Sequence, residues 1–329
     1  MKAIVVKLEK KKPRFVWEEV PDIEPEPEEV LVDIKATAVN RADLLQAMGL
    51  YPPPPGESEI LGLEMAGVVS VMGDQVKGCN IGDRVSGLLS GGGYAQQVAI
   101  HPEMLLHLPD NWSFVQGAAI PEVWLTAFSN LFMEGGLESG QNVLIHAGGS
   151  GVGTAGIQMA REAGAVVFVT AGSVAKLDRC RELGAFLGVN YKKQDFVKEV
   201  MAATQGQGVD MILDPIGADY LDQNLKLLRE YGRLINIGLL GGSMAEINLG
   251  AVLSKSLRII GTRLRSRSLA QKIEITRMFA DRFWPRLEAG TLKPVIDVVF
   301  PIEEAQAAHV YVKQNKNIGK VILEVGASG

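Results

Sequence analysis

Glycine residues gather in one short segment, His146 to Gly153 (HAGGSGVG). The run before it, Val143 to Ile145, is apolar at every position, and the segment after it has the small and apolar spacing of a helix. At a strand-to-helix turn, glycines let the backbone approach a phosphate, and the free N–H groups and positive end of the helix attract its charge. The pattern predicts that the pyrophosphate of a dinucleotide binds at Gly148, Gly151 and Gly153.

One position departs from the G-x-G-x-x-G pattern, because Ser150 stands where the middle glycine is expected. A hydroxyl there either donates a hydrogen bond to a phosphate or crowds it, and we favour donation. The competing interpretation is a plain tight turn without a ligand. The flanking strand and helix favour the ligand-binding interpretation.

The end of the next predicted strand bears on which dinucleotide binds. NAD enzymes usually carry Asp or Glu about 20 residues after the glycine motif, to bind the ribose 2′-hydroxyl. Here that place reads Thr170-Ala171-Gly172-Ser173, while Ser173, Lys176 and Tyr191 can donate to a 2′-phosphate. The sequence therefore predicts NADP(H), unless Lys176 is only a solvated helix residue and Tyr191 only a strand-end aromatic.

Two kinds of pattern along the chain must position these residues. From about residue 121, short apolar runs alternate with helical segments, as in a parallel sheet covered on both faces. The first third instead shows short strands broken by Pro and Gly, and a mixed pattern returns after residue 258. We expect an α/β protein in which residues 1–120 and 259–329 form a β-rich domain around a doubly wound nucleotide-binding domain, residues 121–258.

Composition and charge exclude several other classes. The 329-residue chain has a net charge of −5, which argues against a general nucleic-acid binder. No apolar stretch approaches the length of a membrane span, and the start MKAIVVKLEKKK has too short an apolar run for a signal peptide. We expect a cytoplasmic protein without membrane contact. Its two cysteines, Cys79 and Cys180, lie too far apart in sequence to predict a disulfide or metal cluster.

A second motif bears on metal chemistry. Gly62 to Gly67, with Gly73 and Val76, has the spacing of the zinc alcohol dehydrogenase signature G-H-E-x-x-G-x5-G-x-x-V, but Leu63 stands at the His ligand position. Asn40 falls where the zinc enzymes that carry this signature have a Cys ligand. A catalytic zinc needs three protein ligands, so we expect no metal and assign Glu64 a buried contact with an arginine.

These motifs resemble the zinc-free quinone oxidoreductases of the medium-chain dehydrogenase/reductase superfamily, the zeta-crystallin-like group. Segments such as VNRADLLQAMGLYPPPPG, IPEVWLTAF, HAGGSGVGTAGIQ and NKNIGK are most similar to its tumour-suppressor-inducible branch, in which Ser150 is normal. The resemblance implies a GroES-like domain, a Rossmann domain, a cleft between them and a homodimer formed through the Rossmann sheets.

The resemblance also assigns residues to parts of the cofactor. Asn40, Arg41 and Asp43 are implied near the nicotinamide, Thr126 near its carboxamide, and Gly151 and Val152 at the pyrophosphate. Gly172, Ser173, Lys176 and Tyr191 would face the adenine ribose phosphate. The nicotinamide side would be closed by Leu239, Leu240, Gly241, Gly242, Arg263, Leu264 and Arg265, with Asn317 as a further contact. The competing interpretation of Arg263, Arg265 and Arg267 is a solvated basic run.

The predicted reaction is hydride transfer from NADPH to a quinone, an acceptor electron-poor enough to need no metal. Tyr51, followed by four prolines, either hydrogen-bonds a quinone oxygen or packs the loop. Asn40 and Ser150 are the other candidates at the reaction centre. Two alternatives remain: reduction of an activated C=C bond in an enone or enal, and a non-catalytic NADPH-binding role in RNA binding or structure. The acidic balance argues against RNA.

Overall fold

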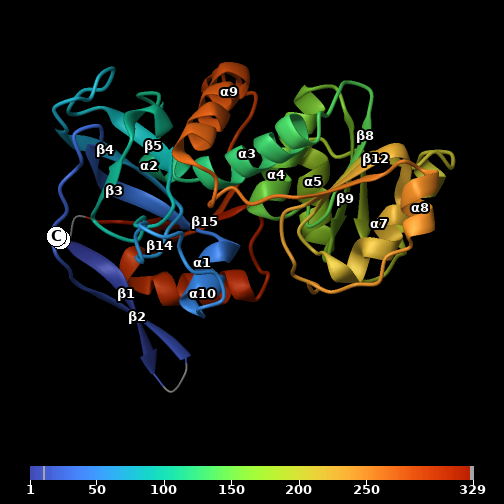
Figure 1. The fold of residues 1–329 in the computed structure, drawn as a ribbon, viewed down its shortest axis with the longest axis horizontal. Coiled ribbons are helices and arrows are strands. Elements are labelled where there is room, and N and C mark those ends of the chain that lie inside the picture. Colours follow the sequence, from blue (N-terminus) through green and yellow to red (C-terminus); the bar gives the residue numbers. More distant parts are fainter. Residues whose placement is uncertain (10–11, 327–329) are drawn as a thin grey trace. The chain divides into compact units, whose positions relative to one another are not determined.

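The computed structural model describes residues 1–9 and 12–326 of the chain (Figure 1). The chain divides into two compact units. The first unit comprises Met1–Leu125 and Leu264–Gly329, and the second comprises Thr126–Arg263.

The first unit is built on a seven-stranded sheet. Six strands follow the order β14-β15-β3-β4-β5-β7, and β6 also pairs with β3. All described pairings in this sheet are antiparallel except β14 with β15. These strands are β3 (Val30–Val39), β4 (Glu64–Met72), β5 (Arg84–Leu88), β6 (Gln97–Ile100), β7 (Leu105–His107), β14 (Ile296–Pro301) and β15 (Lys320–Glu324). The last strand of the chain therefore lies inside the sheet, beside one of the first.

A separate hairpin and several helices complete the first unit. The antiparallel hairpin is β1 (Lys2–Glu9) with β2 (Lys12–Glu19). The helices are α1 (Arg41–Ala47), α2 (Phe114–Gly117), α9 (Leu269–Glu288) and α10 (Ala305–Lys313), with short 3-10 turns η1 (Pro102–Met104) and η4 (Ile302–Glu304). Helix α3 (Pro121–Phe128) runs without a break from the first unit into the second.

The second unit is built on a six-stranded, fully parallel sheet of order β10-β9-β8-β11-β12-β13. Its strands are β8 (Asn142–Ile145), β9 (Val166–Ala171), β10 (Leu187–Asn190), β11 (Val209–Asp214), β12 (Leu228–Asn236) and β13 (Arg258–Gly261). Side chains such as Leu144, Phe168 and Ile212 are buried in its core. The strand order reverses between β8 and β11, and in such sheets the ligand binds beyond the carboxyl ends of the strands at that point.

Helices cover both faces of this sheet. Helices α4 and α5 contact each other and strands β8 to β10, whereas α6, α7 and α8 form a second contiguous group (Figure 1). The helices are α4 (Gly151–Glu162), α5 (Val174–Leu183), α6 (Phe196–Ala203), α7 (Leu221–Leu227) and α8 (Leu249–Ser254), with a π-helical turn η2 (Ser129–Glu134) and a 3-10 turn η3 (Ala218–Tyr220).

The predicted α/β class is confirmed, with a β-rich unit and a doubly wound parallel unit. One strand differs from the sequence-based division, because β13 begins where the outer domain was expected to resume and instead pairs with β12 in the parallel sheet. Within the described residues, no helix has both the length and the apolar character needed to cross a bilayer.

Candidate active site

The glycine turn of the second unit has no room for side chains at two positions. A Cβ on Gly153 would lie 2.5 Å from the carbonyl oxygen of Ala147, and one on Gly148 would lie 2.9 Å from the Cβ of Val169. Ser150 caps helix α4, because its hydroxyl oxygen accepts a hydrogen bond from the Gly153 N–H at 3.0 Å. This leaves the hydroxyl proton of Ser150 available to a ligand.

Three amide groups of this turn are left for a ligand. The N–H groups of Gly149, Gly151 and Val152 form no hydrogen bond with any residue that the structure describes. Two of them belong to the first turn of α4, where the helix dipole adds positive potential. The donors and the closely packed backbone therefore fit a pyrophosphate, as the sequence predicted.

The neighbouring strand ends collect donors that fit a ribose phosphate. The hydroxyl of Tyr191 would lie 2.9 Å from a Cβ on Gly172, and the Cε of Lys192 would lie 3.1 Å from it. Ser173 caps α5 by accepting from the Lys176 N–H, and the aliphatic stem of Lys176 lies 3.0 Å from a Cβ built on Gly149. The structure thus brings the predicted donors together and adds Lys192.

A buried hydrogen-bonded chain connects the strands behind this edge. Asn224 Nδ2 donates to Asp214 at 3.1 Å, so its Oδ1 accepts from His146 Nε2 at 2.8 Å. His146 Nδ1 then accepts from the Thr170 hydroxyl at 2.9 Å. Burial lowers the pKa of His146 to about 4, although the bond to Asn224 opposes this shift. The imidazole is therefore neutral and holds the ends of β8 and β9 in place.

The same series of hydrogen bonds extends to the loop Leu239–Gly242, which was predicted to close the nicotinamide side of the cofactor site. The Asp214 carboxylate accepts from the N–H groups of Ile216 and Gly217. The turn that follows binds the loop Leu239–Gly242, since the Gly241 N–H donates to the Ile216 carbonyl at 2.7 Å. The side chains of Leu239 and Leu240 are more than half exposed. Asp214 thus helps to fix the loop while its apolar side chains face outward.

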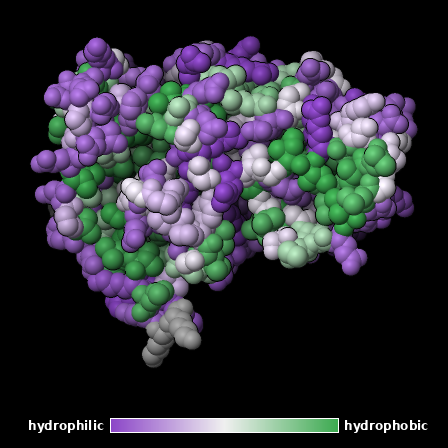
Figure 2. Space-filling view, in the orientation of Figure 1, coloured by the Kyte–Doolittle hydropathy of each residue, from purple (hydrophilic) through white to green (hydrophobic). Residues whose placement is uncertain are grey.

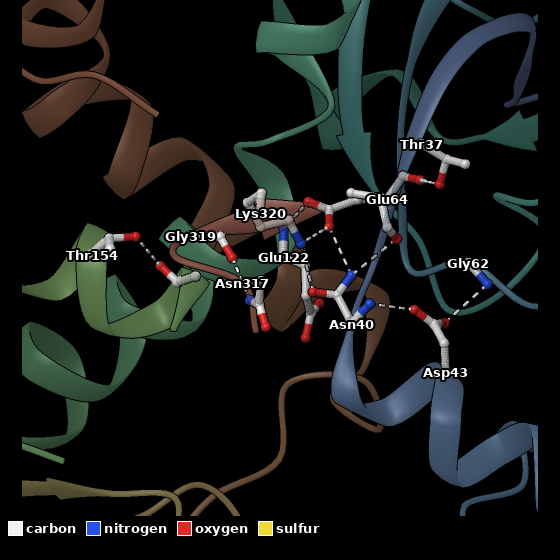
Figure 3. A network of polar contacts seen from close by, with 12 residues as sticks. Thr37, Asn40, Asp43, Gly62, Glu64, Glu122, Thr154, Asn317, Gly319 and Lys320 are labelled. Carbon is white, nitrogen blue, oxygen red and sulfur yellow. Dashed lines mark hydrogen bonds and ion pairs between the residues drawn. The ribbon is translucent and has the colours of Figure 1, made fainter. Parts of the chain in front are cut away.

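In the first unit, Asn40 belongs to a buried ionic cluster (Figure 3). Its Nδ2 donates to Glu64 Oε1 at 2.7 Å, and its Oδ1 accepts from Lys320 Nζ at 2.7 Å. Lys320 Nζ also contacts Glu64 Oε1 at 2.6 Å, and both charged side chains are almost completely buried. The expectation that Glu64 pairs with an arginine was wrong. Lysine fills that role because β15, which carries it, pairs with β3, the strand that ends just before Asn40.

Asp43 supports this cluster from the first turn of α1. Its carboxylate accepts from the Asn40 N–H at 2.7 Å and from the Gly62 N–H at 3.1 Å (Figure 3). Burial raises the pKa of Asp43 to about 7, while the two backbone donors and Lys320 oppose the shift. The Tyr94 hydroxyl forms a hydrogen bond with His309 Nε2 at 3.0 Å, and burial followed by the negative charges of Asp43 and Glu64 raises the pKa of Tyr94. Since Asp43 is fully buried, it positions Asn40 rather than presenting an open carboxylate.

Glu122 joins the cluster through its backbone. Its N–H donates to Glu64 Oε2 at 2.9 Å, so both carboxylate oxygens of Glu64 are engaged. The pKa of Glu122 is raised to about 8, chiefly by burial and then by the negative charge of Glu64. Lys320 and Arg265 oppose this shift and Asp43 adds to it. The carboxyl group therefore carries a proton at neutral pH.

Tyr51 lies against a second buried cation. The guanidinium of Arg265 lies 5.4 Å from the Tyr51 ring centre and donates to the carbonyl oxygens of Ser90 and Tyr51. Lys272 donates to the Ser90 hydroxyl from helix α9. The interpretation of Arg265 as part of a solvated run was wrong, because its exposure is only 4%. Arg263 is exposed, and Leu264 is buried.

The other predicted residues lie at several different places. Arg41 donates to Asn315, and Asn317 Nδ2 donates to the Gly319 carbonyl at 2.7 Å, on the loop before Lys320. Thr126 is buried on α3, one helical turn after Glu122.

Sequence reasoning missed three groups at these sites: Lys192, Glu122 and Lys320. Lys192 was adjacent to a predicted donor, whereas Lys320 is 256 residues from Glu64 and gave no local signal.

Known family models match most of the chain. A zinc-binding dehydrogenase model matches residues 151–279, and an alcohol dehydrogenase GroES-like domain model matches residues 26–110. A solved NAD-dependent alcohol dehydrogenase is 32% identical, with a TM-score of 0.85, and the match covers 99% of this chain and all of that one. The chain belongs to the medium-chain dehydrogenase/reductase superfamily, and its units are the predicted GroES-like and Rossmann domains.

Relatives in this superfamily carry different names. Escherichia coli quinone oxidoreductase, solved in complex with NADPH, is 27% identical over 98% of this chain and 99% of that one, with a TM-score of 0.87. The CurK enoyl reductase is 29% identical with the same coverage and a TM-score of 0.86. A phenolphthiocerol synthesis polyketide synthase of Mycobacterium marinum is 34% identical over 90% of this chain. The chain spans only 13 to 18% of the length of the first three such synthases.

Proposed function

We propose that this protein is a zinc-independent, NADPH-dependent reductase that transfers a hydride to a small quinone. The observation that carries the proposal is the set of donors at the edge of the parallel sheet. Three free amide groups face a pyrophosphate position, and Ser173, Lys176, Tyr191 and Lys192 cluster where a ribose phosphate would lie. A carboxylate that would repel that phosphate is absent from the strand end Thr170 to Ser173.

NADP(H) is the cofactor of this chain, as its sequence predicted. Support comes from membership of the superfamily, from the likeness to a quinone oxidoreductase solved with NADPH, and from the donor set described above. The cofactor supplies a hydride when it is bound. The protein's own residues bind its phosphates, orient its ring and exclude water from the acceptor.

Zinc independence rests on the residue types in the first unit. Asn40 and Leu63 stand where zinc enzymes of the superfamily have Cys and His ligands, and Lys320 already supplies a positive charge to Glu64. No group of three or more His, Cys, Asp or Glu residues in the described part of the chain is arranged to hold a metal ion. We propose that chelators leave the activity intact.

Reduction of an activated C=C bond is the second candidate. It is favoured by the likeness to an enoyl reductase and to segments of polyketide synthases. The same hydride donor serves both reactions, because quinones, enones and enals are all electron-poor at a carbon conjugated to a carbonyl. After hydride transfer the acceptor must take up a proton. The acceptor determines where that proton is added, and this distinguishes the two reactions.

An acceptor panel tests these proposals. NADPH oxidation is followed with 9,10-phenanthrenequinone, smaller quinones, enones and enals, with and without a chelator, and the products are identified. Turnover of quinones without loss to the chelator supports the first proposal, and saturated carbonyl products support the second. Saturable NADPH binding without turnover of any acceptor would contradict both and favour a non-catalytic role.

We also propose a cytoplasmic homodimer formed through the second unit. Strand β13 is one of the two edges of the parallel sheet, and among the described strands only β12 pairs with it. Apolar side chains gather in the region of helix α8 (Figure 2). The most exposed of them are Met244, Leu249 and Leu253, at 89%, 69% and 83% exposure. Analytical ultracentrifugation of the wild type and an Ile259→Lys variant tests this assembly.

A further inference from the structure

The carboxyl group of Glu122 does not contribute a hydrogen bond or ion pair to the fold of the described residues. Glu122 contacts the ionic cluster through its N–H, which donates to Glu64. Its carboxyl oxygens form no hydrogen bond or ion pair with another residue in the described part of the chain, and the side chain keeps partial exposure. Asp43 and Glu64, in contrast, are fully buried and bonded on both oxygens.

Four charged side chains act electrostatically on this carboxyl. Glu64 of β4 and Asp43 of α1 disfavour a negative charge, whereas Lys320 of β15 and Arg265 after β13 favour one. Burial and Glu64 outweigh the two cations, so the pKa of Glu122 is raised to about 8. The group thus holds a proton at neutral pH, and its partial exposure lets water restore that proton after it is lost.

The neighbours of Glu122 are residues expected at the reacting end of the cofactor. Thr126, four residues later on α3, lies on the same face of that helix. The family resemblance implies that Thr126 lies near the nicotinamide carboxamide. Asn40, expected at the same end, shares the carboxylate of Glu64 with the Glu122 N–H. Glu122 therefore shares a helix face with Thr126 and shares the Glu64 carboxylate with Asn40, the two residues that the resemblance assigns to the nicotinamide end.

We propose that Glu122 is a catalytic residue that donates the proton completing reduction of the acceptor. This inference rests on the proposed reductase function. The reduced nicotinamide supplies two electrons and one hydrogen nucleus as hydride, and the acceptor becomes an enolate or a hydroquinone anion. The Glu122 O–H bond breaks, its proton forms a new bond to that anion, and the carboxylate takes a proton from water.

The two acceptor classes should depend on Glu122 to different degrees. An enolate is strongly basic, so its formation gains much from a positioned acid, and general acid catalysis contributes about 10²- to 10⁴-fold. A hydroquinone anion is much less basic and gains less. The glutamate therefore extends the range of acceptors from quinones towards enones and enals.

The test compares the wild type with Glu122→Gln, which keeps the shape and the backbone N–H but has no acidic proton. For an enal we expect kcat to fall by about 100-fold or more, and for 9,10-phenanthrenequinone by about tenfold or less. The wild-type rate should fall as pH rises through about 8, because the donor loses its proton. The rate of the variant should not show this fall, the basic limb of the pH profile. The Kd for NADPH, measured by fluorescence, should be unchanged. Glu303→Gln, an exposed glutamate of the same unit, is the matched control and should behave as wild type.

Other outcomes overturn the inference. An unchanged kcat and the same basic limb in Glu122→Gln would remove the proton-donor role while leaving the reductase function intact. Loss of NADPH binding in the variant would assign Glu122 a structural role instead. Failure of the wild type to oxidise NADPH with any acceptor would overturn the proposed function itself. In Glu122→Ala, restoration of the enal rate by added acetic acid would support the proton transfer independently.

Discussion

The ionic cluster of the first unit and the hydrogen-bonded chain through His146 in the second unit are equally buried, but they differ in the charge of the groups that they bury. The first unit buries Asp43, Glu64 and Lys320 together, and it keeps Asp43 and Glu122 close to titration at physiological pH. The second unit buries a neutral imidazole whose hydrogen bonds run in one direction. A charged cluster is suited to moving protons, whereas a neutral chain is suited to fixed geometry. This contrast agrees with our proposals that the reaction takes place at the first unit and that the second unit binds the cofactor.

Lys320→Met should produce the largest effect, because it removes the cation that compensates Glu64. Breaking one partner of a buried ion pair costs about 3–5 kcal/mol, so the free energy of unfolding should fall by that amount, as measured by denaturant titration. Adding Glu64→Gln to this variant should recover part of the loss, since the uncompensated charge is then gone. An equal loss in the single and double variants would mean that the cluster is not held by charge.

His146→Gln should have the next largest effect. The effect should appear as a change in how the free energy of unfolding depends on pH. The folded state keeps His146 neutral down to about pH 4, while the unfolded chain binds a proton near its ordinary pKa of about 6.5. The wild type should therefore lose stability as pH falls from about 6.5 to about 4, by up to about 3 kcal/mol from this residue.

The variant should show a smaller loss over the same window, as measured by denaturant titration at several pH values. Gln keeps an N–H for Asn224, so the variant should still fold. If the free energy of unfolding changed with pH in the same way in both proteins, this would contradict a neutral His146 and weaken the contrast between the units.

Lys176→Glu tests cofactor placement directly. Losing a hydrogen bond to a charged group costs about 1.5–3 kcal/mol, equivalent to about a 10- to 100-fold rise in the KM for NADPH. The KM for NADH should change much less, because NADH has no 2′-phosphate. Lys198→Glu, on exposed α6, is the matched control. An unchanged preference for NADPH would contradict the assignment of Lys176.

Tyr51→Phe should have the smallest effect. The ring packs on Arg265 with or without its hydroxyl, so stability should change by less than about 1 kcal/mol. If the hydroxyl stabilises charge on a quinone oxygen, kcat with 9,10-phenanthrenequinone should fall several-fold, and Tyr231→Phe, an exposed tyrosine of the second unit, should have no effect. Wild-type turnover in the variant would remove Tyr51 from the reaction.

Local patterns were enough to predict the strand, turn and helix at the edge of the second unit where we propose that the cofactor binds. Strand, turn and helix follow one another along the chain, so Gly148, Ser150 and Gly153 could be placed from spacing alone. Lys176 follows for the same reason, because it begins the helix after the next strand. Parallel sheets of this kind carry their ligand donors at strand ends, which the sequence shows directly.

The ionic cluster of the first unit could be predicted only in part. Asn40 and Glu64 were recognised by their place in a motif, but their partner Lys320 comes from the last strand. Antiparallel pairing of β15 with β3 brings it there, and no periodicity in the sequence encodes that register. Glu122 was missed because one glutamate on a short helix has no distinguishing spacing.

The position of β15 also determines when the first unit can be completed during synthesis. The ribosome makes Glu64 long before its counter-charge, which is 256 residues away, whereas every strand of the second unit has by then emerged. Contacts so distant in sequence form slowly, because closing a long loop costs entropy before any pairing rewards it. The nascent chain should therefore fold its second unit first, and the first unit should stay incomplete until β15 inserts beside β3. In the cell, that interval is when the chain is most exposed to aggregation and to chaperones.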